Sequence, residues 1–316
     1  MINVLAVHAV DVTKRYGDLI AVNNVSLDVD QGEVYGVLGP NGAGKTTFLR
    51  MLFGLIRADG GSLEVLGKTW PADGIGTLAG VAGFIESPRF YPYLSGRRNL
   101  ELLAALDGGN AHRIDEVIDT VDLTGRDRDK VKGYSFGMRQ RLGVASALLR
   151  DPRLLVLDEP ANGLDPAGIR DMRALVKRLA DHGLTVLLSS HDMAEVEEIC
   201  DNVTIMRRGT VAYHGTIATL REQAPDPVRR LSTADDAAAL AAASAHPTLT
   251  VTRDGSALIV HGDQGAADAY IRDIVTNGGR LRSLTIDETP LEALFFMLTE
   301  ADQPASEPAV LAGVGS

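Results

Sequence analysis

Cysteine and aromatic residues are scarce in this sequence. Its 316 residues include one cysteine and one tryptophan, and aromatic side chains make up 5% of the chain. The lone cysteine, Cys200, excludes an internal disulfide framework and fits a reducing compartment. Because Cys200 falls in a predicted helix, we interpret it as an inert thiol in the core rather than a nucleophile. Disulfide-stapled secreted domains are therefore excluded as a class.

Positive charge is also in deficit. The chain has 31 Lys and Arg against 42 Asp and Glu, which gives a formal net charge of -11 at pH 7. Since phosphate backbones are bound mainly by Lys and Arg, we do not expect nucleic acid as a partner. The apolar content of 45% and the charged content of 23% are ordinary for a globular protein, so widespread disorder is not expected either.

Long apolar runs are missing as well. No stretch approaches the roughly 18 apolar residues of a membrane-spanning helix. The start, Met1–Val12, is interrupted by Asn3, His8 and Asp11 and has no basic leading segment, so it predicts a strand rather than a signal peptide. We expect a cytoplasmic protein whose membrane role, if it has one, comes through a partner chain.

The first 220 residues predict an α/β fold. Short β-rich runs alternate with helical stretches, and residues 87–150 predict a helical insertion. The predicted strands are Val4–Val12, Val25–Val29, Val34–Leu38, Leu154–Leu157, Thr185–Ser189 and Val203–Arg207. Leu154–Leu157 is apolar throughout, which is typical of a parallel strand buried on both faces.

The composition changes at Gln223–Pro227, where two prolines predict a linker. Residues 228–300 then predict a small α+β domain with ferredoxin-like order, including a hairpin turn at Asp254-Gly255. Residues 301–316 are small and Pro-containing and predict a disordered tail. The expected division is thus a domain over 1–222, an accessory domain over 228–300, and a tail.

A glycine-rich run follows the predicted strand Val34–Leu38 and matches the P-loop pattern. Its residues are Gly39, Pro40, Asn41, Gly42, Ala43, Gly44, Lys45, Thr46 and Thr47. The glycines let backbone N–H groups turn toward phosphate oxygens, and the following helix presents its positive end to the same anion. Lys45 is expected at the β- and γ-phosphates, and the Thr46 hydroxyl on Mg²⁺. The cofactors predicted are ATP and Mg²⁺.

Asp158 and Glu159 close the apolar strand Leu154–Leu157. Alone, an apolar run followed by two acids also fits an ordinary strand end. Downstream of a P-loop, it indicates that Asp158 holds the Mg²⁺ hydration shell and that Glu159 polarises the attacking water.

With these motifs, residues 4–220 resemble the ATP-binding cassette (ABC) ATPases, and most closely the branch serving bacitracin and lantibiotic resistance and drug export. The resemblance implies a RecA-like P-loop core, an antiparallel β subdomain and a helical subdomain, with the α+β domain appended. Tyr16, in Lys14-Arg15-Tyr16-Gly17, matches the aromatic on which adenine stacks.

The segment Tyr134-Ser135-Phe136-Gly137-Met138 occupies the place of the family's LSGGQ signature and departs from it at three positions. It keeps Ser135 and Gly137, which match the pair that contacts the γ-phosphate bound by the other subunit. Asp165, in Asn162-Gly163-Leu164-Asp165, matches the D-loop at the dimer interface. The resemblance therefore implies a second copy of the chain as a partner, although Ser135 also fits an ordinary helix start.

His191 matches the family's switch histidine, which contacts the γ-phosphate. Glu86, in Gly83-Phe84-Ile85-Glu86-Ser87-Pro88, stands where the family has Gln near Mg²⁺ and the attacking water; a similar Glu occurs in the lantibiotic-immunity branch. We predict a catalytic and metal-binding role for Glu86. The aromatic run from Phe90 to Leu94 fits either the groove for the membrane partner or core packing.

These features predict the ATP-hydrolysing subunit of an exporter for an antibiotic, peptide or drug-like substrate. It would lie at the cytoplasmic face of the membrane on separate integral permease subunits. The alternative is an ABC ATPase without a membrane partner, but such chains usually carry two cassettes, a long coiled coil or zinc cysteines. A regulatory module without turnover is disfavoured by Glu159 and His191.

Overall fold

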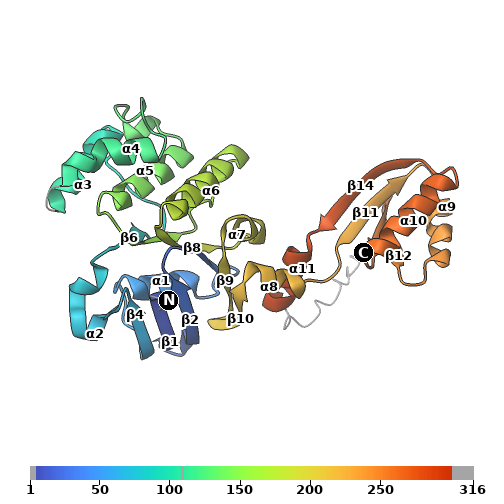
Figure 1. Ribbon diagram of the computed structural model, residues 1–316, viewed down its shortest axis with the longest axis horizontal. Helices are drawn as coiled ribbons and strands as arrows, with labels where there is room; N and C mark the ends of the chain where they lie inside the picture. The colour runs from blue at the N-terminus through green and yellow to red at the C-terminus, as the bar shows by residue number, and fades with distance from the viewer. Residues whose placement is uncertain (1–4, 108–109, 301–316) are drawn as a thin grey trace, which may run out of the picture. The chain divides into compact units, whose positions relative to one another are not determined.

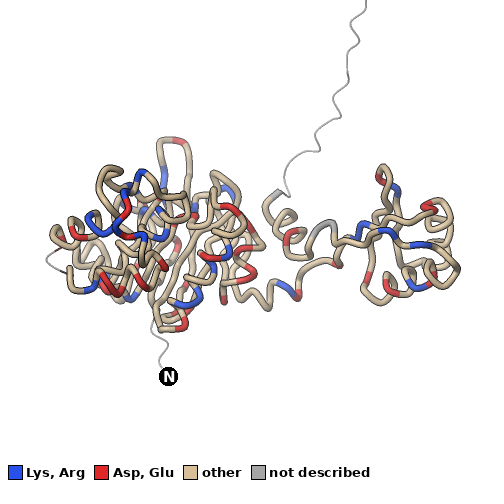
Figure 2. The backbone as a smooth tube through the Cα atoms, turned by 90° about the horizontal axis from the view of Figure 1, so that it is seen from above, with Lys and Arg blue, Asp and Glu red and all other residues tan. Residues whose placement is uncertain are grey.

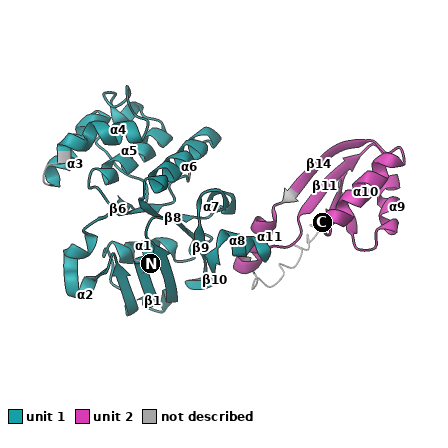
Figure 3. Cartoon of the chain, viewed as in Figure 1, with its two compact units in different colours: residues 1–223 teal, residues 224–316 magenta. Residues whose placement is uncertain are grey.

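The computed structural model describes residues 5–107 and 110–300. The chain forms two compact units, the first ending at Gln223 and the second beginning at Ala224 (Figure 3). Basic and acidic residues are interspersed over both units (Figure 2). The predicted tail, 301–316, lies outside the described residues. We describe the units separately.

A six-stranded sheet in the order β10-β9-β3-β8-β7-β6 is the centre of the first unit (Figure 1). Its members are β3 (Val34–Leu38), β6 (Val81–Phe84), β7 (Leu154–Asp158), β8 (Thr185–Ser190), β9 (Asn202–Arg207) and β10 (Thr210–Thr216). All neighbouring strands are parallel except β10, which is antiparallel to β9. The strands β3, β7 and β8 are buried at every position, as expected for a sheet covered on both faces. The polar residues at the ends of β7 and β8, Asp158, Ser189 and Ser190, are buried with them.

A second, antiparallel sheet has the order β2-β1-β4-β5. It consists of β1 (Leu5–Tyr16), β2 (Leu19–Asp30), β4 (Gly60–Val65) and β5 (Lys68–Thr69). One hydrophobic core joins residues from both sheets and from α1 (Lys45–Leu52), including Val7, Phe48 and Leu154. The P-loop helix is thereby fixed between the two sheets.

Some of the remaining helices of this unit contact the sheets, and others lie in the insertion after β6. They are α2 (Trp70–Asp73), α3 (Gly96–Leu106), α4 (Ile114–Thr120), α5 (Phe136–Leu148), α6 (Pro166–Asp181), α7 (Met193–Ile199) and α8 (Ile217–Glu222), with 3₁₀ turns η1 (Gly74–Leu78), η2 (Asn110–Arg113) and η3 (Val131–Gly133). Helices α3, α4 and α5 pack together (Figure 1). The predicted α/β class is confirmed, and the helices lie where the sequence predicts an insertion.

The second unit is an antiparallel sheet in the order β12-β13-β11-β14 with two helices packed on it. Its elements are β11 (Val228–Thr233), α9 (Asp236–Ala242), η4 (Ala243–Ala245), β12 (Thr250–Asp254), β13 (Ala257–His261), α10 (Gln264–Thr276), β14 (Leu281–Glu288) and α11 (Pro290–Glu300). Leu231, Leu258 and Tyr270 are fully buried members of its core. The βαββαβ order through β14 is the predicted ferredoxin-like order.

Candidate active site

The P-loop lies between the carboxyl end of β3 and the start of α1, where open α/β sheets bind ligands. Gly42 and Gly44 have φ values of 83° and 106°, a region that L-residues with side chains rarely adopt. A Cβ on Gly44 would lie 2.5 Å from the Ala21 carbonyl oxygen. The Gly39 N–H donates to the Ser190 carbonyl at 3.2 Å, which ties the loop to the end of β8.

Lys45 is the cation of this loop and is only 4% exposed. Its Nζ donates to the Gly39 carbonyl at 2.6 Å and lies 3.1 Å from Glu159 Oε1. A buried ammonium needs such partners because its desolvation is costly. The structure therefore brings Lys45 of the P-loop and Glu159 of the acidic pair into contact.

The Thr46 hydroxyl donates to Asp158 Oδ2 at 3.0 Å. A hydroxyl and a carboxylate at this spacing are the oxygen donors that Mg²⁺ prefers, with the remaining positions going to phosphate and water. Thr46 and Asp158 thus fit a magnesium ion that arrives with a nucleotide. Asn41 and Glu86 line the same pocket.

Glu159 follows Asp158 with its backbone in the left-handed region, at φ 49°. Its side chain lies between two groups, with Oε1 near Lys45 and Oε2 2.5 Å from His191 Nδ1. His191 lies in the short loop between β8 and α7. The Glu159 carboxylate is 18% exposed, so water can reach it from one side.

Glu86 lies beyond the end of β6, also with a positive φ of 65°. It lines the pocket of Thr46, Asp158 and Glu159, but Oε1 accepts a hydrogen bond of 2.6 Å from Arg50 Nη2. We did not predict Arg50 from the sequence. Arg50 stands four residues after Thr46 on α1, and residues at that spacing share a helix face. From this spacing, the sequence alone could have placed Arg50 on the same side of α1 as Thr46, which faces the proposed Mg²⁺ position.

A cavity of about 590 Å³ opens beside the P-loop. Tyr16, 47% exposed, lines it together with Leu19, Lys45 and Arg208. Lys14 Nζ lies 5.4 Å from the centre of the Tyr16 ring. An exposed aromatic ring at the far end of a phosphate loop can stack on a base. Arg208, in the turn between β9 and β10, is a second residue that the sequence reasoning missed.

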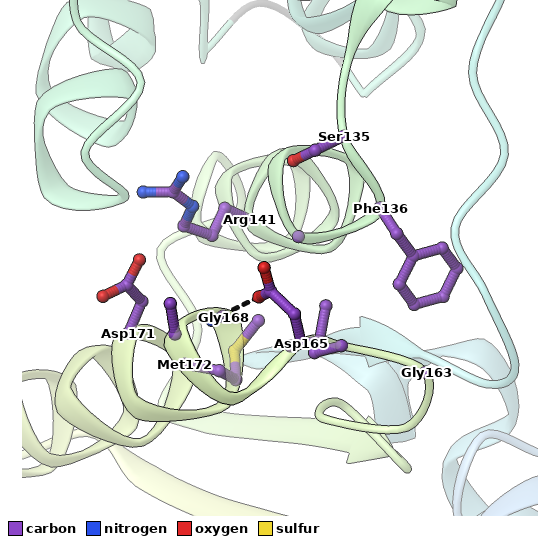
Figure 4. A pocket seen from close by; sticks show the side chains of 11 residues that line it. Ser135, Phe136, Arg141, Gly163, Asp165, Gly168, Asp171 and Met172 are labelled. Carbon is purple, nitrogen blue, oxygen red and sulfur yellow. Dashed lines mark hydrogen bonds between the residues drawn. The ribbon is translucent and has the colours of Figure 1, made fainter.

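Ser135, Gly137 and Asp165 line a different cavity, of about 390 Å³ (Figure 4). Ser135 caps α5 by accepting the Met138 N–H at 3.1 Å, and Asp165 caps α6 by accepting the Gly168 N–H at 2.7 Å. Two helix N-termini therefore meet at one cavity, an arrangement that favours an anion. Lys45 and Thr46 do not line this cavity.

A family model for ABC transporters matches residues 22–162. The bacitracin transport ATP-binding protein BcrA of Enterococcus faecalis is 34% identical over 302 residues, which covers 94% of this chain and 97% of BcrA. The chain belongs to the ATP-binding proteins of the ABC transporters.

Further comparisons agree with this membership. The lantibiotic transport ATP-binding protein SrtF of Streptococcus pyogenes is 37% identical over 198 residues, 63% of this chain and 85% of SrtF. A solved ATP-binding subunit of an ABC transporter superposes with a TM-score of 0.61 at 28% identity, covering 69% of this chain and 92% of that one. The predicted family and its bacitracin and lantibiotic branch are confirmed, and so are ATP binding and the ABC ATPase fold.

Proposed function

We propose that this ABC ATP-binding subunit hydrolyses ATP to ADP and phosphate with Mg²⁺. The observation that carries the proposal is the placement of Glu159 between Lys45 and His191 at the mouth of the P-loop. A carboxylate beside a phosphate-binding cation can accept the proton of an attacking water. Lys45 and His191 would contact the γ-phosphate from either side of Glu159.

Thr46 and Asp158 would hold the Mg²⁺ ion, supported by their contact at 3.0 Å. The ion would neutralise charge on the β- and γ-phosphate oxygens. Tyr16 would stack on adenine, and the backbone from Gly39 to Thr47 would enclose the phosphates. Glu86 would offer a further oxygen to the metal or the water, with Arg50 offsetting its charge.

The hydrolytic unit that we propose is a head-to-tail dimer of two copies. Ser135 and Gly137 present a helix N-terminus in a cavity that Lys45 does not line. In one chain they are therefore not part of the cavity beside its own P-loop, and they would complete the site of a second copy. Asp165 lies at the same cavity and would belong to that interface.

The dimer would drive export through separate integral permease subunits at the cytoplasmic face of the membrane. Within the part of the chain that the structure describes, no helix is long and apolar enough to span a bilayer. Tyr91 and Tyr93 are 54% and 62% exposed with ring centres 5.8 Å apart, and we propose that they contact the permease. The bacitracin and lantibiotic transport names of the relatives support a peptide-antibiotic substrate.

We assign residues 1–222 as the ATPase domain, with a helical subdomain over about 87–150, and residues 228–300 as an accessory domain. The unit boundary after Gln223 supports the first assignment. The packing of α3, α4 and α5 against one another supports the helical subdomain.

Phosphate release tests the proposed reaction directly. The purified chain is expected to release phosphate slowly from Mg-ATP, faster with its permease in vesicles, and not at all after EDTA. The reason is that the signature must come from a second chain, whose position the permease would fix. Absence of phosphate release in the complex would refute the ATPase proposal, and full turnover at nanomolar protein without the permease would refute the coupling.

A further inference from the structure

The hydroxyl of Ser189 joins the two acidic residues of the site. Ser189 is fully buried in β8 and pairs in register with Asp158 on the neighbouring parallel strand β7. Its Oγ donates to Asp158 Oδ1 at 2.6 Å and accepts the backbone N–H of Glu159 at 2.9 Å. One hydroxyl has one donor and two acceptor positions, so these two bonds use its donor and one acceptor.

The bond to Asp158 restrains the carboxylate that faces the P-loop. Ser189 donates to Oδ1 at 2.6 Å, and the Thr46 hydroxyl lies 3.0 Å from Oδ2 and 3.3 Å from Oδ1. Without Ser189 the carboxylate could turn about its terminal torsion, which is broad for Asp. A hydrogen bond to a charged acceptor is also stronger than a neutral one. Ser189 thus limits the rotation of the Asp158 carboxylate beside Thr46.

The bond to Glu159 acts on the backbone. Glu159 has φ 49°, a conformation that is unfavourable for a residue with a side chain and persists only where its surroundings hold it. The Ser189 hydroxyl accepts the N–H of this residue. From this backbone position the Glu159 side chain reaches Lys45 and His191.

We propose that Ser189 is a positioning residue that sets the metal carboxylate Asp158 and the general base Glu159 in one fixed geometry. The inference rests on the proposed ATPase function, and Ser189 itself exchanges no proton with the substrate. Hydrogen-bond partners of metal ligands typically contribute about 10–100-fold to metal affinity or activity.

The neighbouring serine supplies a matched control. Ser190 is 2% exposed in the same strand, but its hydroxyl donates to Glu195 Oε2 at 2.6 Å and accepts the Asp192 N–H at 3.0 Å. Because successive residues of a strand face opposite sides, Ser190 contacts neither acidic residue through its side chain. Ser189→Ala and Ser190→Ala therefore remove the same buried group from the two faces of one strand.

The experiment measures Mn²⁺ binding by electron paramagnetic resonance with a non-hydrolysable ATP analogue, metal-free nucleotide binding in EDTA, and kcat and KM for ATP. Ser189→Ala is expected to weaken Mn²⁺ affinity and to lower kcat by about 10–100-fold, with metal-free nucleotide affinity and KM changed less than twofold, roughly 0.4 kcal/mol. Ser190→Ala is expected to keep the wild-type Mn²⁺ affinity. Ser189→Thr, which keeps the hydroxyl, should recover most of the loss.

Wild-type Mn²⁺ affinity in Ser189→Ala would overturn the proposal, and so would equal losses in the two alanine variants. If Ser189→Ala does not fold, Ser189→Cys replaces it, because a thiol is a weak donor and an intermediate loss is then expected. If the wild-type chain binds Mn²⁺ and nucleotide but releases no phosphate, the ATPase proposal fails, while the metal titration still decides the role of Ser189 toward Asp158.

Discussion

Replacing Glu159 by Gln is expected to slow ATP hydrolysis by about 10²–10⁴-fold, the usual range for the loss of a general base. The amide keeps the shape of the carboxylate but cannot accept the proton of the attacking water. ATP binding should persist, because Lys45 keeps its bonds to the P-loop carbonyls. Phosphate release and equilibrium binding of ATP together check both halves of this prediction.

A matched control is Glu64→Gln, the same chemical change at an exposed position of β4, which should leave hydrolysis unchanged. In the Glu159→Gln variant ATP would remain between the two chains, so size-exclusion chromatography with Mg-ATP should show a dimer. A monomer alone under saturating ATP would count against the head-to-tail dimer. Normal turnover would remove Glu159 from the role of general base.

Replacing Lys45 by Ala is expected to weaken ATP binding by about 1.5–3 kcal/mol, the range for hydrogen bonds to charged groups, or roughly 10–150-fold in Kd. Lys45 is the buried cation of the loop, with Nζ 2.6 Å from the Gly39 carbonyl. Its removal also leaves the Glu159 carboxylate without its neighbouring positive charge, which adds repulsion toward phosphate. Isothermal titration calorimetry with ATP measures the change.

Lys177→Ala removes the same charge from an exposed position of α6 and should bind ATP as the wild type does. Unchanged ATP affinity in Lys45→Ala would show that the P-loop cavity is not the nucleotide site. Equal weakening in both variants would point to net charge rather than to a specific phosphate contact.

The buried parallel strands were the most predictable part of the fold. Val34–Leu38 was predicted with its observed bounds, because a strand covered on both faces has a continuous apolar sequence. The antiparallel sheet was predicted poorly: β1 runs to Tyr16 and β2 starts at Leu19. Irregular register between these strands and a positive φ at Asp11 interrupt the two-residue alternation of buried and exposed residues. The sequence pattern therefore suggests a strand end at positions where the strand continues.

The candidate site also has a part that the sequence predicts and a part that it does not. Lys45, Asp158, Glu159 and His191 sit in short motifs with a fixed chemical reason at each position, and the structure places them together. The bond of Ser189 to Asp158 spans 31 positions, and that of Arg50 to Glu86 spans 36. Neither pair has a local sequence pattern, because sheet register creates the first and the packing of α1 near the end of β6 creates the second.

The central claim is that each ATP is held by the P-loop of one chain and the signature of another. Two inactive variants test it when mixed, Lys45→Ala, which lacks the P-loop cation, and Ser135→Arg, which blocks the signature. Both are made in the Glu159→Gln background so that bound ATP persists. Neither variant alone should retain ATP through gel filtration. A mixed dimer has one site with an intact Lys45 from one chain and an intact Ser135 from the other, so the mixture is expected to retain ATP. If the mixture retains no more ATP than the separate variants, the shared site is wrong.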